Sequence, residues 1–158
     1  MRKMQVNRLV TIAGIGAIAA IVAFVAFLQV EAARNNEFKS SIDQIAFDTI
    51  ALTHEYQAEE GKWNSKQYDN STMIAIIDNY QPRYQELIDR ANTLDTPERY
   101  KAAKDYLIKS VEAEKQSNER FRNYLVTGDR GEYEKSVNLI SQSLQYSANY
   151  DAAIKEAG

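Results

Sequence analysis

The sequence predicts an all-α protein, in which a single N-terminal transmembrane helix is followed by an antiparallel up-down four-helix bundle. Three observations predict this class. Residues 9–28 carry no charged side chain. Beyond them, apolar residues recur at steps of three and four, the spacing of a helix face, and no segment shows the alternation of a strand. The 158 residues include only six Gly and two Pro, so few positions interrupt a long helix.

The N-terminal apolar run has the length of a membrane span. Twenty helical residues at 1.5 Å each reach about 30 Å, the thickness of a bilayer's hydrocarbon core. Arg2, Lys3 and Arg8 precede the run without an acidic residue, and positive charge is retained on the cytoplasmic side. We therefore expect a cytoplasmic basic tail over residues 1–8, a signal anchor over residues 9–30 and an extracytoplasmic bundle over residues 31–158. The expected location is the cell membrane, with a single pass.

A cleaved signal peptide is the alternative to this anchor. Val30, Glu31 and Ala32 offer a cleavage-like sequence, with Glu31 a poor fit, and the apolar run is longer than a usual signal core. Small residues within the run would let a second membrane helix approach closely, although they are also common in single spans. The candidate packing positions are Ala13, Gly16, Ala17 and Ala20.

Two helices are predicted in the first half of the bundle. The first covers residues 31–59, continues the membrane helix and ends at Gly61, because no Pro or Gly interrupts residues 17–60. Its core positions are Phe38, Ile42, Ile45, Thr49, Leu52 and Tyr56. The second covers residues 71–94 and buries Met73, Ile77, Tyr80, Tyr84, Leu87, Ala91 and Leu94. Pro82 lies inside this unbroken pattern, which predicts one kinked helix.

Two further helices follow, each with a start signal. Thr96 is a good N-cap with Pro97 at the first helical position, and Gly128 is the expected left-handed residue beyond the end of this third helix. Asp129 and Glu132 form a capping-box pattern that begins the fourth helix. Its expected core positions are Tyr133, Val137, Ile140, Leu144, Ser147, Asp151 and Ile154.

Polar and aromatic residues near these seams are the candidates for binding. Ten of the 158 residues are Tyr, and we expect most of them to pack a ring inward with the hydroxyl reaching water. Glu114, Ser117 and Asn118 interrupt the apolar pattern of the third helix. They form either a buried polar layer or an exposed stretch of a rotated helix, and we expect exposure. The candidate residues for ligand or partner binding are Tyr80, Tyr84, Glu114, Asn118 and Tyr124.

Composition argues against several functions. The chain has no Cys and one His, so thiolate metal sites and paired histidines are excluded, and His54 is expected at the surface. Residues 31–158 hold 16 basic and 22 acidic residues, a net charge of −6, which argues against nucleic-acid binding. No catalytic motif is present, so we expect neither enzymatic activity nor a cofactor or metal. Asn70 begins an N-x-S/T glycosylation pattern.

One stretch resembles a known class of domain. Residues 120–129, RFRNYLVTGD, followed by Tyr133, are similar to the inter-helix turn of extracytoplasmic four-helix-bundle sensor domains, as in chemoreceptors and some histidine kinases. The resemblance implies a ligand-sensing bundle outside the cytoplasm and carries over no individual binding residue. Those receptors have a second membrane helix after the bundle, whereas no second apolar span occurs before Gly158.

These observations together predict a non-enzymatic, membrane-anchored helical bundle that binds a protein partner or a small ligand outside the cytoplasm. The expected partners are the lipid bilayer and a membrane or extracytoplasmic protein. One alternative is an accessory subunit of an integral-membrane enzyme complex, docked through the small-residue span. Another is a carboxylate-based enzyme or metal protein. The oligomeric state is left open.

Overall fold

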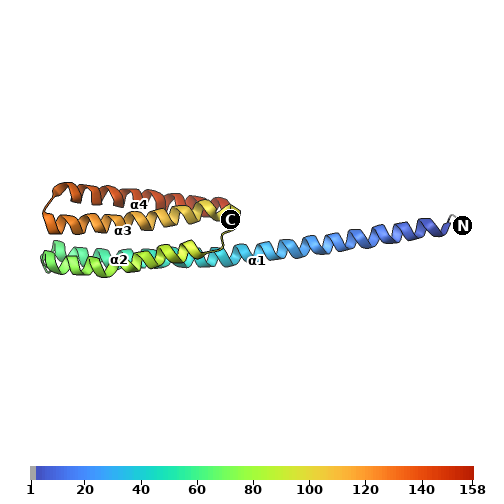
Figure 1. Ribbon diagram of the computed structural model, residues 1–158, viewed down its shortest axis with the longest axis horizontal. Helices are drawn as coiled ribbons and strands as arrows, with labels where there is room; N and C mark the ends of the chain where they lie inside the picture. The colour runs from blue at the N-terminus through green and yellow to red at the C-terminus, as the bar shows by residue number, and fades with distance from the viewer. Residues whose placement is uncertain (1–2) are drawn as a thin grey trace. The chain divides into compact units, whose positions relative to one another are not determined.

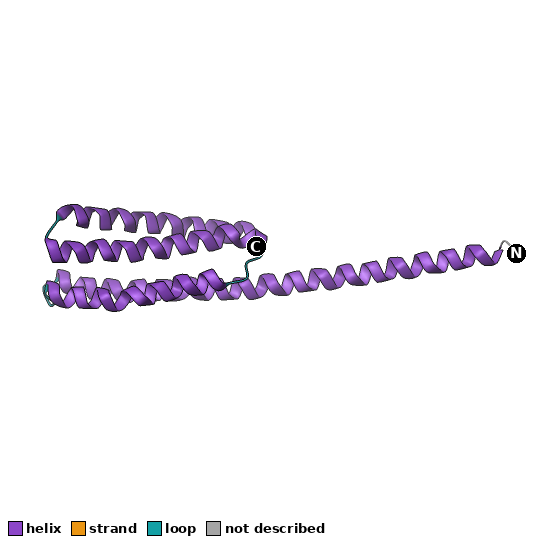
Figure 2. Cartoon of the chain, in the orientation of Figure 1, coloured by secondary structure: helices purple, strands orange, loops and turns teal. Residues whose placement is uncertain are grey.

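The computed structural model describes the backbone of residues 3–158 and the side chains of residues 28–158. The described chain is helical, and Figure 2 shows loops only at its connections. The elements are α1 (Lys3–Asn64), α2 (Asn70–Thr93), the 3₁₀ turn η1 (Glu98–Tyr100), α3 (Lys101–Thr127) and α4 (Arg130–Ala157). Residues 1–37 and 38–158 form two units, with α1 beginning in the first and ending in the second. The predicted all-α class with four helices is therefore confirmed.

The predicted membrane span falls almost wholly outside the described side chains. Among residues 28–158, no stretch of helix combines the length and the apolar character needed to cross a bilayer. Of the predicted anchor over residues 9–30, only Leu28, Gln29 and Val30 belong to this part. The candidate packing positions Ala13, Gly16, Ala17 and Ala20 also lie outside it.

The second unit is a four-helix bundle whose consecutive helices run in opposite directions (Figure 1). Ion pairs between α1 and α2 show this direction. Arg83 Nη2 lies 2.7 Å from Glu55 Oε2, and Arg90 Nη2 lies 2.8 Å from Asp48 Oδ2. A step of seven residues forward on α2 thus corresponds to seven residues backward on α1. The up-down arrangement of the four helices follows the prediction.

The apolar seams predicted for α1 and α2 are confirmed. The six predicted positions on α1 are buried, and on α2 five of the seven are buried: Met73, Ile77, Tyr84, Leu87 and Ala91. The other two, Tyr80 and Leu94, are half-buried. They pack into two clusters, one around Ile42 and Tyr100 and a smaller one around Tyr56 and Phe121. Pro82 lies inside α2 without dividing it, as the unbroken apolar pattern predicts.

The end of α1 differs from the prediction. Gly61 does not end the helix, which continues to Asn64. The helix is closed by a Schellman motif, in which the Lys66 N–H donates to Trp63 O at 2.8 Å and the Gln67 N–H donates to Lys62 O at 2.9 Å. Lys66 takes the left-handed conformation at φ 60°, which glycine usually occupies. The extra turn places the Trp63 ring edge-on to Phe121, with ring centroids 5.1 Å apart.

The start of the third helix also differs. Thr96 does not cap it, because the Thr96 hydroxyl donates to Leu94 O at 2.9 Å. The chain instead passes from Pro97 through the 3₁₀ turn η1 into α3. Such a turn lets Tyr100 enter the core, where it packs against Phe38 at a ring-centroid distance of 5.1 Å.

The turn between α3 and α4 follows the expected chemistry in part. Gly128 takes the left-handed conformation at φ 72°, and Asp129 caps α4 by accepting from the Gly131 N–H at 2.8 Å. The reciprocal half of the capping box does not form. The Asp129 N–H donates to the Thr127 hydroxyl, and the Glu132 carboxylate contacts Arg120 and Lys135 instead.

The predicted core face of α4 is wrong. The helix turns its small residues inward, and the buried positions are Ser136, Ser143 and Tyr150. Most of the predicted heptad faces outward, with Ile140 38% exposed and Leu144 66% exposed, whereas Ile154 is half-buried against the core. Small side chains allow α4 to approach α3 closely enough for hydroxyl groups of one helix to bond the backbone of the other.

Because this heptad faces outward, charged substitutions there should be tolerated. Ile140→Glu is expected to change the free energy of unfolding by no more than about 0.5 kcal/mol, the usual range for surface positions. Chemical denaturation of the full chain measures this directly. A loss of several kcal/mol would place Ile140 in the core, in conflict with the burial of Ser136 and Ser143.

Candidate functional site

A buried polar layer lies in the middle of the bundle, and all four helices contribute to it. α1 supplies Thr53, α2 supplies Tyr84, α3 supplies Glu114, and α4 supplies Ser143. Thr53 Oγ1 lies 2.6 Å from Glu114 Oε2, and the Ser143 hydroxyl lies 3.2 Å from Glu114 Oε1. The Tyr84 phenol also lies beside the Glu114 carboxyl. A single carboxyl group on α3 therefore connects the four helices.

The serines that position this layer form a ladder between α3 and α4. Ser110 Oγ lies 3.0 Å from Ser143 Oγ, and Ser117 Oγ lies 2.9 Å from Ser136 Oγ. Ser110 and Ser117 also donate to the backbone carbonyls of Ser143 and Ser136, at 3.1 Å and 2.9 Å. A step of seven residues on each helix keeps the four serines on the facing sides of an antiparallel pair. This spacing holds Ser143 in position beside Glu114.

Burial makes the Glu114 carboxyl a weaker acid than an exposed glutamate. Desolvation raises the pKa of the Glu114 carboxyl above its ordinary value of 4.5, while the hydrogen bonds from Thr53, Ser143 and Tyr84 oppose the rise. Desolvation also raises the pKa of the Tyr84 phenol, which therefore stays protonated and can donate. A carboxylate that burial disfavours lowers stability, and such groups concentrate at functional sites.

The Thr53 hydroxyl next to Glu114 has more acceptors around it than it has protons to donate. The Thr53 hydroxyl has one proton and two neighbouring acceptors, Thr49 O at 2.9 Å and Glu114 Oε2 at 2.6 Å. When Glu114 is protonated, its hydroxyl donates to Thr53 and Thr53 donates to Thr49. When Glu114 is ionised, two acceptors compete for a single proton. The geometry thus agrees with the raised pKa.

Glu114 is only partly buried because it lines a cleft of about 530 Å³ bordered by α1, α3 and α4. Apolar side chains contribute to its walls, including Phe47 and Ile50 from α1, Leu107 from α3 and Leu144 from α4. Asp43 and Asp151 contribute carboxylates, and His54 is the one basic residue in the described lining. We call this feature the Glu114 cleft. Apolar side chains and polar or charged groups both line it, and a small-molecule site needs both.

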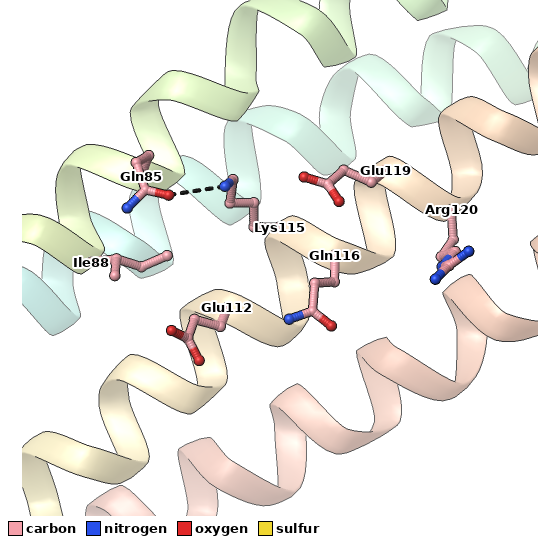
Figure 3. Close-up of a pocket in the computed structure, with 7 residues that line it drawn as sticks. All are labelled: Gln85, Ile88, Glu112, Lys115, Gln116, Glu119 and Arg120. Atoms are coloured by element: carbon pink, nitrogen blue, oxygen red, sulfur yellow. Dashed lines mark hydrogen bonds between the residues drawn. The ribbon is translucent and has the colours of Figure 1, made fainter.

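A second groove lies elsewhere on the bundle, over α2 and α3. Its volume is about 500 Å³, and Figure 3 shows Lys115 reaching across to Gln85 at 2.9 Å, Nζ to Oε1. Glu112, Glu119 and Arg120 are further lining residues, so both signs of charge are present and Ile88 is its single apolar member. This balance of exposed charges is typical of a solvated surface, and the groove is the weaker candidate.

The predicted binding residues do not form a single cluster. Tyr84, Glu114 and Asn118 come together in the polar layer, where the buried side-chain nitrogen of Asn118 has no hydrogen-bond partner among the described residues. Tyr80 lies beside this group and packs edge-on against Tyr56, with ring centroids 5.4 Å apart. Tyr124 lies near the α3–α4 turn. Its ring centroid is 5.3 Å from that of Tyr133, away from the Glu114 cleft.

Two expectations about exposure are wrong. Ser117 and Asn118 are each only 2% exposed, so the middle of α3 forms a buried polar layer and not an exposed face. Helix α3 packs against neighbours on two sides, and its serine face meets α4. Several tyrosines are also buried more deeply than expected. Tyr84 is 1% exposed, and the buried Tyr56 hydroxyl has no hydrogen-bond partner among the described residues.

The sequence patterns missed Thr53, Ser143 and the apolar walls of the cleft. Serine is not an apolar residue, so apolar periodicity does not reveal the serines that recur seven residues apart on α3 and on α4. His54 lies at the surface as expected, on the border of the cleft. Asn70 is the first residue of α2 and is exposed; its amide accepts from the Trp63 indole N–H at 3.0 Å. Its glycosylation stays a prediction.

Metal binding has no geometric support in the described part of the chain. Among residues 28–158, no three His, Asp or Glu side chains lie close enough together to hold an ion. Comparison with models of known protein families, with curated proteins and with solved structures finds no match. The similarity to sensor bundles therefore stays a prediction from residues 120–133.

Proposed function

We propose that this chain is a non-enzymatic, membrane-anchored helical bundle that binds a small ligand outside the cytoplasm, in the Glu114 cleft. The observation that carries the proposal is a partly buried carboxyl at a cleft of about 530 Å³ with apolar walls. Keeping this carboxyl among apolar helices lowers stability, which a purely structural serine or leucine at the position would not do. The resemblance of residues 120–133 to sensor bundles is consistent with the proposal.

The membrane anchor in this proposal rests on the sequence. The uncharged run over residues 9–28 and the three basic residues before it support an uncleaved span with the bundle outside. The chain has no Cys, so single cysteines report topology without background. In intact cells, an impermeant maleimide should label Ser141→Cys, an exposed position on α4, and leave Asn7→Cys unlabelled until the membrane is opened. Labelling of both sites, or of Asn7→Cys alone, would contradict this topology.

Ligand binding in the cleft is tested by filling it. A thermal-shift screen of cationic, neutral and anionic small molecules against the full chain should find compounds that raise the melting temperature. Leu144→Trp places a large ring at the cleft and should abolish these shifts. Ile140→Trp, about one turn earlier on the exposed face and outside the cleft lining, is the matched control and should retain them. Shifts that survive in Leu144→Trp would place binding elsewhere.

A protein partner is the second candidate, and one observation favours it. Tyr133, Val137 and Ile140 are exposed along α4, and residues 136–150 contain no charged side chain. Depletion of charge with exposed aromatic and aliphatic groups is typical of the core of a protein interface. An accessory subunit of a membrane enzyme complex would use such a surface. Co-purification that is lost in Val137→Glu, with Glu134→Gln as control, would support this role.

A further inference from the structure

We infer that the Glu114 cleft selects an organic cation, a positively charged head group carried on an apolar body. The inference rests on the proposed function and names its class of ligand. It comes from the way charge and apolar surface are distributed around the cleft.

The charged groups that border the cleft are acidic. Asp43 and His54 face it from α1, Glu114 from α3 and Asp151 from α4, while Tyr84 contacts Glu114 from α2. The described lining contains no Lys or Arg. Asp43 is already paired with Lys39 and accepts from the Tyr150 hydroxyl at 3.4 Å. The Glu114 carboxyl contacts hydroxyl groups and forms no ion pair among the described residues, so no positive charge of the bundle is paired with it.

The walls supply an apolar surface for the remainder of such a ligand. Phe47 is 66% exposed and Ile50 is 57% exposed on the α1 side, and Leu144 is 66% exposed on the α4 side. An aromatic ring such as that of Phe47 attracts a cation over its face. An anion would be repelled by the acidic residues that line the cleft, whereas a cation can pair with the ionised Glu114 carboxyl.

Cation binding should be coupled to release of a proton. The pKa of Glu114 is raised by burial, and a cation beside the carboxyl favours its ionised form. A positive ligand therefore binds the ionised state and displaces the proton held at lower pH. The pKa of the Tyr84 phenol is raised, so this group stays neutral throughout. His54 also lines the cleft, so a His54→Gln variant separates its contribution from that of Glu114 in the test.

Three probes of matched size separate the possibilities: 2-phenylethylammonium, 2-phenylethanol and phenylacetate, titrated into the full chain by isothermal calorimetry. We expect the ammonium to bind at least tenfold more tightly than the alcohol, and phenylacetate to bind more weakly still. Titration in two buffers of different ionisation enthalpy should show proton release. Affinity for the ammonium should rise with pH across the titration of Glu114, and His54→Gln should keep this rise.

Two glutamate-to-glutamine substitutions on α3 complete the test, one inside the cleft and one outside it. Glu114→Gln should weaken ammonium binding at least tenfold and remove both the proton release and the pH dependence. Glu112→Gln, an exposed position outside the cleft lining, should leave all three unchanged.

Equal affinity for the three probes, or preference for the alcohol or the acid, would overturn the cation assignment while leaving a ligand-binding cleft. Binding that survives in Glu114→Gln would overturn it as well. If no probe binds, the cation assignment fails. The proposed function is then decided separately by the broader screen with Leu144→Trp.

Discussion

Replacing Ser117 with Leu is expected to lower the free energy of unfolding by about 3 kcal/mol, the largest effect among the polar positions of the bundle. Ser117 is 2% exposed, and its hydroxyl lies 2.9 Å from both the carbonyl and the hydroxyl oxygens of Ser136. A leucine side chain does not fit where the serine hydroxyl already touches the backbone of the facing helix. It must separate α3 from α4 and also remove the hydrogen bond to Ser136.

The matched control is Ser141→Leu on the exposed side of α4. This substitution adds the same side chain where nothing opposes it, and we expect a change within about 0.5 kcal/mol. Urea unfolding of both variants, with circular dichroism as the probe, measures the difference. If Ser117→Leu were as stable as the parent, the close approach of α3 and α4 through the serines would be wrong.

Glu114→Gln is expected to raise the free energy of unfolding at neutral pH, whereas most substitutions at buried positions lower it. Glutamine keeps a carbonyl oxygen for Thr53 or Ser143 and removes a charge that burial disfavours. We expect a gain on the order of 1 kcal/mol, within the usual range of single substitutions. For a bundle of this size, that gain corresponds to roughly 4 °C in melting temperature.

The pH dependence of this gain has a defined sign. The pKa of Glu114 is higher in the folded chain than its ordinary value of 4.5. As pH rises from 4.5 to the folded pKa, the unfolded chain loses this proton while the folded chain keeps it, so the parent becomes less stable. Above the folded pKa the loss is complete and constant. The advantage of Glu114→Gln should therefore be small below pH 4.5 and full above the folded pKa.

Thermal unfolding of the two chains between pH 4 and pH 8 measures this effect. Glu112→Gln serves as the control because Glu112 is exposed on the same helix. A stability difference that stayed constant over this pH range would mean that folding does not raise the pKa of Glu114. If Glu114→Gln also abolished ammonium binding, a gain in stability would show that the loss of affinity is not caused by unfolding.

The apolar periodicity predicted the buried faces of α1 and α2 well because these faces are made mainly of large apolar residues. On α1 and α2, the residues that recur at steps of three and four are those that pack into the core, from Ile42 to Tyr84. Gly128 and Asp129 were predictable because their backbone roles are local. Helix ends that depend on tertiary contacts were not predictable, as Lys66 and the extra turn after Gly61 show.

The candidate site was only partly predictable for a related reason. Glu114 and Asn118 were recognisable as polar residues within an apolar pattern, but the pattern did not determine which way they face. Burial depends on the neighbour that covers the helix, and here α4 covers α3 with serines. Thr53 and Phe47 belong to the site only because α1 lies beside the cleft.

The sequence by itself determined the helical class, the approximate extents of the helices and their up-down order, because these follow from spacing, few breaking residues and short connections. It also supplied the expectation of a membrane anchor from the uncharged run and its basic flank. Only the tertiary structure decided which face of α4 is buried. The serines of α3 and α4 let these two helices pack closely, and the larger apolar residues of α4 lie at the surface. That choice gives the bundle both its polar layer and the Glu114 cleft, since helix rotation is settled by packing between helices and not by the periodicity of one helix.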